Sequence, residues 1–226
     1  LLADGHLLFE GHPGLGKRSL AHTMAQLTGL SFANFACTPD MEPSDLTGTE
    51  QLREDPETQK RRYQFLPGPL FANIAYVEDI HLAPPRSLAV LVDSMRRRQV
   101  GHGRSIQDLP APFAMIATEP PASEDTDWAL NESVTDRFLL MMSFAYPSET
   151  EEWEIGRRAG SAASVILDPL ISPTELTTLQ EAAAQVEMSE EVLGYAWALA
   201  RATRPGNDLA PDFVETWIRL GVSPQG

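Results

Sequence analysis

The feature that most constrains this chain is a glycine-rich stretch, GHPGLGK, between an apolar run and an amphipathic segment. The pattern G-x-x-x-x-G-K is met at Gly11, Gly16 and Lys17. Residues 6–10 predict a short strand, and apolar residues at helical spacing after Lys17 predict a helix that ends near Gly29. In this context, loop amides and a helix N-terminus bind phosphate, and the lysine reaches the outer phosphates. The stretch therefore predicts a phosphate-binding loop, in a chain that has only two lysines.

One position of the predicted loop departs from the usual pattern. A Ser or Thr, whose hydroxyl binds Mg²⁺, normally follows the lysine, but here the residue is Arg18. Ser19 lies about 100° further around the helix and is poorly placed to replace that hydroxyl. Two interpretations of Arg18 stay open: it pairs directly with phosphate oxygens, or it turns away to pair with Glu78 or Asp79. The residues predicted to bind the nucleotide are Gly11, His12, Pro13, Gly14, Leu15, Gly16, Lys17, Arg18 and Ser19.

The rest of the chain predicts an α/β core followed by helices. Apolar runs at 31–37, 72–79, 112–118 and 138–146 predict strands, and 85–98 predicts a helix. Such alternation implies a mostly parallel sheet with helices on both faces. We expect irregular structure or a short helix at 38–62, and a hairpin or loop at 100–110.

The strand signals stop near residue 170. Ser172, Pro173 and Glu175 form the capping-box start of a helix, and two more amphipathic helices follow. The pattern predicts two units: an α/β core over 1–168 and a small helical unit over 169–226.

Composition narrows the class of protein. The 226 residues are 42% hydrophobic, with no apolar stretch of the ~18–20 residues that a membrane helix needs. The first residues lack the features of a signal peptide, and the lone Cys37 is compatible with a reducing compartment. We therefore expect a cytoplasmic protein. Residues 121–226 carry 18 acidic against 6 basic side chains, and such an acidic surface makes nucleic acid an unlikely partner.

A second motif is the acid pair Glu78–Asp79 at the end of a predicted strand. Nucleotide hydrolases place acids at a strand end beside the phosphate loop, one for the metal shell and one to orient water. Glu78 is the candidate metal ligand, and both acids are candidate catalytic residues. The alternative is an acid pair that merely faces solvent.

Longer blocks, including TPDMEPSDLTGTE, FLPGPLFANIAYVEDIHLAPP and TDRFLLMMSFAYPSETEE, make the chain similar to the MoxR family of AAA+ ATPases from about Leu7 to Gly226. The resemblance implies a P-loop AAA+ core with a helical lid, and assembly into a ring, usually a hexamer, with ATP between subunits. It also implies a chaperone-like remodelling or maturation role, often beside a von Willebrand A domain protein. Relative to the family, the chain looks trimmed at both ends.

The departures from the family pattern concern hydrolysis. The family's loop Thr is Arg18, and its Asp-Glu pair is inverted, which leaves Asp79 one methylene short for orienting water. The sensor asparagine is Pro120, which offers no side-chain hydrogen bond. The lid's sensor arginine is Gln225, so a charge on the phosphate is lost. By this comparison a Mg²⁺ requirement is doubtful.

Arg137, in TDRF, matches the family's arginine finger, which acts on the neighbouring subunit's nucleotide. The alternative is that Arg137 pairs with Asp136 or Glu132. We expect an ATP- or ADP-binding ring subunit with weak or absent hydrolysis, assembled with itself or with an active MoxR paralogue. Two alternatives stay open: a slow but functional ATPase, and a nucleotide-free scaffold.

The remaining residues of interest are expected to have structural roles. Cys37 is expected to be a buried apolar residue, and His12 and His81 are expected not to bind metal. The arginines at 96–98 suit a helix C-terminus. Leu139, Leu140, Met141 and Met142 are expected in the core, and Trp153, Trp197 and Trp217 at the seam between core and lid.

Overall fold

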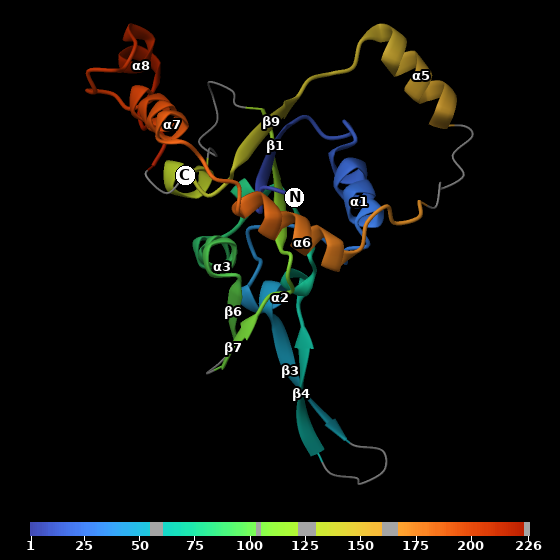
Figure 1. The fold of residues 1–226 in the computed structure, drawn as a ribbon. Helices are drawn as coiled ribbons and strands as arrows, with labels where there is room; N and C mark the ends of the chain where they lie inside the picture. The colour runs from blue at the N-terminus through green and yellow to red at the C-terminus, as the bar shows by residue number, and fades with distance from the viewer. Residues whose placement is uncertain (55–60, 103–104, 122–129, 160–166, 224–226) are drawn as a thin grey trace.

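Five strands form one parallel sheet, in the order β2-β5-β8-β1-β9 (Figure 1). The computed structural model describes residues 1–54, 61–102, 105–121, 130–159 and 167–223. The strands are β1 (Leu7–Gly11), β2 (Phe32–Ala36), β5 (Ile74–Glu78), β8 (Ala114–Glu119) and β9 (Leu140–Phe144). The predicted parallel α/β core is confirmed. Because all five strands run in the same direction, their carboxyl ends share one edge of the sheet.

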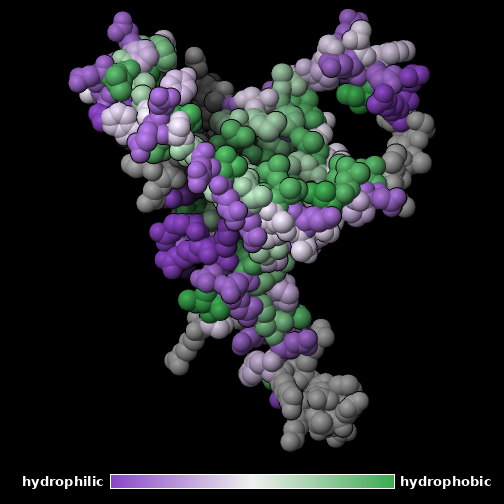
Figure 2. All heavy atoms as spheres, in the orientation of Figure 1, coloured by the Kyte–Doolittle hydropathy of each residue, from purple (hydrophilic) through white to green (hydrophobic). Residues whose placement is uncertain are grey.

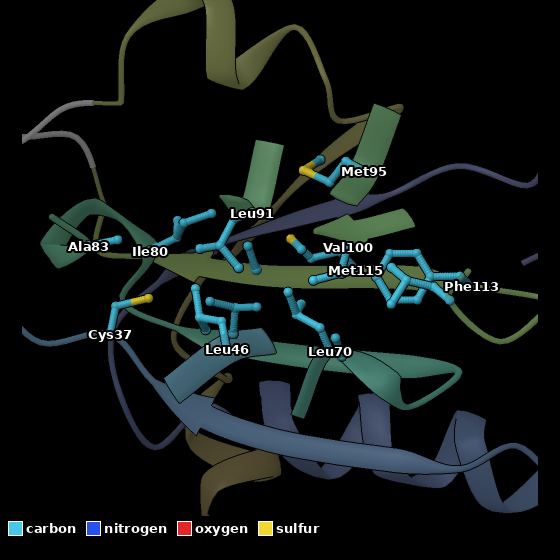
Figure 3. Packing of buried hydrophobic residues seen from close by; sticks show 14 of the residues in the cluster. Cys37, Leu46, Leu70, Ile80, Ala83, Leu91, Met95, Val100, Phe113 and Met115 are labelled. Carbon is cyan, nitrogen blue, oxygen red and sulfur yellow. The ribbon is translucent and has the colours of Figure 1, made fainter. Parts of the chain in front are cut away.

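Helices cover both faces of this sheet. On one face, α1 (Lys17–Leu27) buries Ala21 and Ala25 against a cluster that includes Phe9 and Tyr76. On the other face, α3 (Pro85–Arg97) and α2 (Pro43–Thr47) pack on the cluster drawn in Figure 3, which contains Met115 of β8. Two 3-10 turns, η1 (Pro69–Phe71) and η2 (Ile80–Leu82), flank β5. Successive residues of β8 alternate between the two clusters, as a strand buried on both faces requires.

Two antiparallel hairpins leave the core. One is β6 (Gln99–His102) with β7 (Ser105–Asp108), which confirms the predicted hairpin at 100–110. The other is β3 (Gly48–Glu54) with β4 (Arg61–Pro67), and it projects away from the sheet (Figure 1). Within 38–62 the structure therefore has the short helix that we expected, α2, but also a strand that we did not. The β3–β4 pair was missed because its polar residues lack the alternation that marks a half-buried strand.

In the part of the chain that the structure describes, five helices follow β8: α4 (Glu132–Thr135), α5 (Glu149–Ala159), α6 (Pro173–Ala184), α7 (Glu190–Ala202) and α8 (Asp212–Trp217). The capping box of α6 is present as predicted. Its Leu176 is buried in the cluster on the α1 face, so α6 packs on the α/β core. Helices α7 and α8 form an arm on one side of the molecule, and α5 forms another (Figure 1). The division at 168/169 stays a prediction.

The edge strand β9 corrects one expectation. Residues 139–142 are 43–57% exposed rather than buried, because β9 pairs with β1 alone and its other edge is unpaired among the described residues. Hydrophobic surface gathers between the two arms (Figure 2).

The tryptophans do not lie where the sequence predicted them, at a buried seam between core and lid. Trp153, Trp197 and Trp217 are 77%, 57% and 80% exposed, so they do not fill a seam. They lie on α5, α7 and α8, which the described residues leave largely uncovered. Within the described part of the chain, no helix has the length and apolar character to cross a membrane.

Candidate nucleotide-binding site

The loop between β1 and α1 has the backbone conformation of a phosphate cradle. Gly11, Gly14 and Gly16 all have positive φ, at 149°, 87° and 78°. A Cβ on Gly11 would lie 2.8 Å from the carbonyl oxygen of Phe144, so no other residue fits there without a shift. Gly16 caps α1 without a side-chain hydrogen bond. The first amides of α1 are therefore left for an anion.

Lys17 folds back over this loop. Its ammonium donates hydrogen bonds to the carbonyl oxygens of Gly11 and His12, the latter at 2.9 Å. Burial lowers the pKa of Lys17, and the nearby charges of Asp79 and Glu78 act in the opposite direction. The lysine thus lies between the loop and the acid pair, where it can exchange carbonyl oxygens for phosphate oxygens.

The acid pair is fixed at the carboxyl end of β5. Glu78 is half-buried, and its carbonyl accepts a hydrogen bond from the Cys37 amide at 2.8 Å. Asp79 is exposed and left-handed, at φ 52°, and its amide donates to the Thr118 hydroxyl at 3.1 Å. A left-handed non-glycine residue is uncommon and points to a backbone fixed by its neighbours. The two carboxylates therefore leave the strand end from different backbone conformations.

Arg18 and Ser19 are both exposed at the start of α1. Burial and the charges of Glu78 and Asp79 raise the pKa of Tyr76 to about 12, while Arg18 acts in the opposite direction. Arg18 therefore lies within electrostatic range of this strand end. The described residues show no ion pair between Arg18 and either acid.

Two further carboxylates were missed by the sequence reasoning. Glu10, the next-to-last residue of β1, lies beside Glu119 at the end of β8 in the strand register, and the Ser143 hydroxyl donates to Glu10 at 2.6 Å. Burial and the charge of Glu10 raise the pKa of Glu119. Their only signal in the sequence was that each lies next to the end of a predicted strand. Pro120, in the place of the family's sensor asparagine, follows Glu119 and is exposed.

His12 lies in the phosphate loop, and Cys37 lies beside the acid pair. His12 stacks on Tyr146, with ring centroids 5.1 Å apart. Among the described residues, no group of three His, Cys, Asp or Glu side chains could hold a metal ion. Cys37 is 2% exposed, and burial, with Asp79 nearby, raises the pKa of its thiol to about 12. This confirms the buried apolar cysteine.

A cavity of about 870 Å³ opens beside the phosphate loop. It lies between Gly14–Gly16, the segment Ala145–Pro147 and the inner side of α5, with Glu154 and Arg158 in its wall. Its volume is in the range of small-ligand sites. The sequence reasoning missed this wall because α5 carries no motif and reaches the loop only through the path of the chain after β9.

Arg137 lies at the amino-terminal end of the strands, whereas the phosphate loop lies at their carboxyl end. It precedes β9, whose first residue, Leu140, is in register with Leu7, whereas Gly11 is in register with Phe144. Its Nε is buried without a hydrogen-bond partner. The described residues show no ion pair from Arg137 to Asp136 or Glu132, which was the alternative to a finger role. Gln225 lies outside the described residues, and Ser223 near it contacts Asp136.

Comparisons with known proteins agree with this architecture. The profile of the ATPase family associated with various cellular activities (AAA) matches residues 6–140. Chaperone MoxR1 of Mycobacterium tuberculosis is 33% identical over 228 residues, which cover 100% of this chain and 58% of that protein. Protein MoxR of Methylorubrum extorquens is 26% identical over 254 residues, covering 100% of this chain and 69% of that protein.

A solved crystal structure of a candidate ATPase from Cytophaga hutchinsonii superposes with a TM-score of 0.85 at 27% identity, covering 99% of this chain and 67% of that one. The chain thus spans 58% of the length of MoxR1 and about two thirds of the other two proteins. The matching sheet, phosphate loop and sequence blocks show that this chain belongs to the MoxR-type AAA ATPases.

Proposed function

We propose that this chain is a nucleotide-binding subunit of a MoxR-like ring, with weak or absent hydrolysis of its own. It acts as a chaperone-like remodelling or maturation factor, or as a regulatory subunit beside an active paralogue. The unit predicted over 169–226, which contains α6, α7 and α8, serves as its lid, and a hexamer is the expected assembly. A von Willebrand A domain partner stays a prediction from the family resemblance.

Binding of ATP or ADP is supported by the loop and the cavity beside it. The positive-φ glycines leave the loop amides open, and Lys17 lies over them. The phosphates would contact residues 11–19, while the base and ribose would extend into the cavity against α5. Tyr146, stacked on His12, is a flat surface at the border of that cavity.

The residues present fit the phosphates better than they fit Mg²⁺. A guanidinium stands at position 18, where the metal's hydroxyl ligand is expected, and Glu78 is the carboxylate that remains for a metal. Arg18 is exposed and shows no carboxylate partner, so its charge is available to phosphate oxygens. A bound magnesium ion would supply charge neutralisation on the phosphates; here Arg18 takes that role.

Weak hydrolysis follows from the groups that are missing. Pro120 offers no side-chain hydrogen bond for a γ-phosphate or an attacking water. Asp79 is shorter than the glutamate that usually orients water, and its left-handed backbone turns it from the direction of β5. Removing one preorganised polar group lowers rates by about 10²–10³, and several are altered here.

The observation that carries the proposal is the position of Arg137 without a carboxylate partner, at the sheet edge opposite to its own phosphate loop. This position supports the proposal that Arg137 acts on a neighbouring subunit and not on its own nucleotide. An arginine finger that acts in trans contributes about 10³–10⁵ to the rate of a competent site. A subunit that hydrolyses poorly can therefore still activate its neighbour.

Calorimetric titration with ATP and with ADP, with Mg²⁺ and with EDTA, tests the binding part. We expect similar affinity in both conditions for the parent chain, and none for Lys17→Ala. A strict Mg²⁺ requirement would favour the slow ATPase, because Glu78 would then hold the metal. Absence of binding in both conditions would favour the nucleotide-free scaffold.

A further inference from the structure

The segment after α8, residues 219–223, crosses from the helical arm to the segment that carries Arg137. We call it the strap. It follows α8 and contacts both the C-terminal end of α7 and α4. Each end makes contacts of its own.

On the arm side, the strap is fixed to the end of α7. The Val222 amide donates to the Thr203 hydroxyl at 3.0 Å, and the Arg204 Nε donates to the Val222 carbonyl at 2.9 Å. A Cβ on Gly221 would collide with the Thr203 carbonyl oxygen and lie 2.8 Å from the Arg204 Cα. The two backbones therefore touch, and position 221 has room only for glycine.

On the core side, the strap contacts both ends of α4. Arg219 forms an ion pair with Glu132 at the start of α4, and the Ser223 amide donates to the Asp136 carboxylate at 3.3 Å. Asp136 directly precedes Arg137, whose amide donates to the Val134 carbonyl at 3.0 Å. The backbone that carries Arg137 is thus one residue from a contact with the strap.

A cavity of about 460 Å³ separates the strap from this segment. Its walls are residues 135–139 on one side and 220–222 on the other. Arg137 lines it, so the guanidinium has room to change direction while its backbone stays tied. The ion pair itself is exposed, with Arg219 at 83% and Glu132 at 41%, and such pairs are weak alone. Contacts of this strength can form and break as the arm moves.

We propose that the strap positions Arg137: contacts from α7 through residues 219–223 to Glu132 and Asp136 set the direction of the guanidinium, so that the position of the helical arm controls its action in trans. Glu132, Asp136, Arg219 and Gly221 are positioning residues. This inference rests on the proposed function, in which Arg137 acts on a neighbour. It adds that the arm, which is distant from the phosphate loop in sequence, regulates that action.

Gly221→Ala tests the strap without changing any charge. The added methyl group displaces the strap from Thr203 and loosens its grip on α4. The matched control is Gly194→Ala in α7, where a Cβ meets no atom within 4 Å. By hydrogen exchange, amides of residues 136–139 should exchange about tenfold faster in Gly221→Ala than in the parent or the control, while β8 amides stay unchanged. Unchanged exchange at 136–139 would overturn the inference, whatever the ATPase result.

The functional readout is ATP turnover by a catalytically active MoxR-type partner mixed with this chain. Gly221→Ala should lower the stimulated kcat at least tenfold and leave the KM for ATP unchanged, because a finger acts on the transition state. If Arg137→Ala abolishes stimulation while Gly221→Ala does not reduce it, the strap inference fails and the proposed function stands. If Arg137→Ala has no effect, the proposed function fails, and the exchange experiment alone decides whether the strap holds this segment.

Exchanging the two charges distinguishes the loss of this ion pair from a general folding defect. Arg219→Glu alone places two acids together and should reduce the stimulation. Combining it with Glu132→Arg restores an opposite-charge pair in reversed order and should recover stimulation to within about threefold of the parent. Failure of the double variant to recover, with a normal melting temperature, would contradict a positioning role for this pair.

Discussion

Lys17 and Arg137 lie at opposite ends of the same strand pair. Lys17 follows the loop at the carboxyl end of β1, and Arg137 precedes the amino end of β9, with about 13 Å of paired strand between. The lysine of the phosphate loop and the proposed arginine finger are therefore held apart by the sheet itself. The separation leads to the first prediction.

Arg137→Ala should abolish stimulation of an active MoxR-type partner. Loss of an arginine finger lowers the rate of a competent site by about 10³–10⁵, so the mixed turnover should fall to that of the partner alone. Arg96→Ala is the control, because Arg96 is an exposed arginine paired within its own helix to Asp93. Light scattering must show unchanged co-assembly, and stimulation equal to the parent would contradict a role in trans.

Restoring the altered polar groups should restore hydrolysis. The parent chain alone is expected to turn over ATP near background, and Arg18→Thr, Pro120→Asn and Gln225→Arg together should raise this by about 10²-fold or more. The gain depends on Asp79 serving as the water-orienting acid. Adding Lys17→Ala to the triple variant should remove the gain. A parental turnover near ~1 s⁻¹ would contradict the proposed weak hydrolysis.

His6 should make the fold sensitive to mild acid. It is 5% exposed, its Nδ1 accepts from the Met115 amide at 3.0 Å, and its Nε2 contacts the Met95 carbonyl at 3.1 Å. Burial lowers the pKa of His6, the Met95 contact and Asp4 act in the opposite direction, and Arg98 lowers it further. The unfolded chain therefore takes up a proton first as the pH falls below the ordinary value of 6.5.

The stabilisation that depends on a neutral His6 is thus fully present above pH 6.5 and is lost as the pH falls below it. The free energy of unfolding should decrease by up to about 1.4 kcal/mol per pH unit below 6.5, until the folded state is protonated too. Chemical denaturation of the parent and His6→Gln at pH 7 and pH 5 measures this. The variant should be less stable at pH 7 but lose less between the two values, with His22→Gln, an exposed histidine, as control.

Glu119→Gln should stabilise the chain at neutral pH. Because burial and Glu10 raise the pKa of Glu119, its charge opposes folding, and stability is lost as the pH rises from 4.5 through the folded value. Removing the charge should add a few tenths to about 1 kcal/mol at pH 7 and nothing near pH 3.5, allowing for partial solvent screening. Denaturation at the two pH values tests this, with the exposed Glu181→Gln as control. A gain that is equal at both values would show that the charge is not the cause.

Gly48→Ala should destabilise the base of the β3–β4 hairpin. Gly48 has φ 95°, and a Cβ there would collide with the Leu66 carbonyl oxygen and lie 2.6 Å from the Gly68 nitrogen. Strain of this kind is expected to lower the free energy of unfolding by about 2 kcal/mol or more. Thermal melting compares it with Gly101→Ala in β6, where nothing lies within 4 Å. Equal melting temperatures would contradict the close approach.

Local signals in the sequence were sufficient for the phosphate loop, the parallel core strands and the capped start of α6. The spacing of Gly11, Gly16 and Lys17, and the capping box at Ser172, act over a few residues, so their structural consequence is written in consecutive positions. The same holds for Cys37, whose burial follows from an apolar strand end.

Only the tertiary structure decided which of these elements meet. The apolar run at 139–142 predicted a buried strand, but sheet order made β9 an edge, and burial depends on neighbours that the run does not encode. The pairing of Glu10 with Glu119, the wall that α5 adds to the phosphate loop, and the hydrogen bond from Ser223 to Asp136 join residues far apart in sequence. Strand register and helix docking set such contacts, and because they are properties of the whole fold, local patterns specify the parts but not their distances.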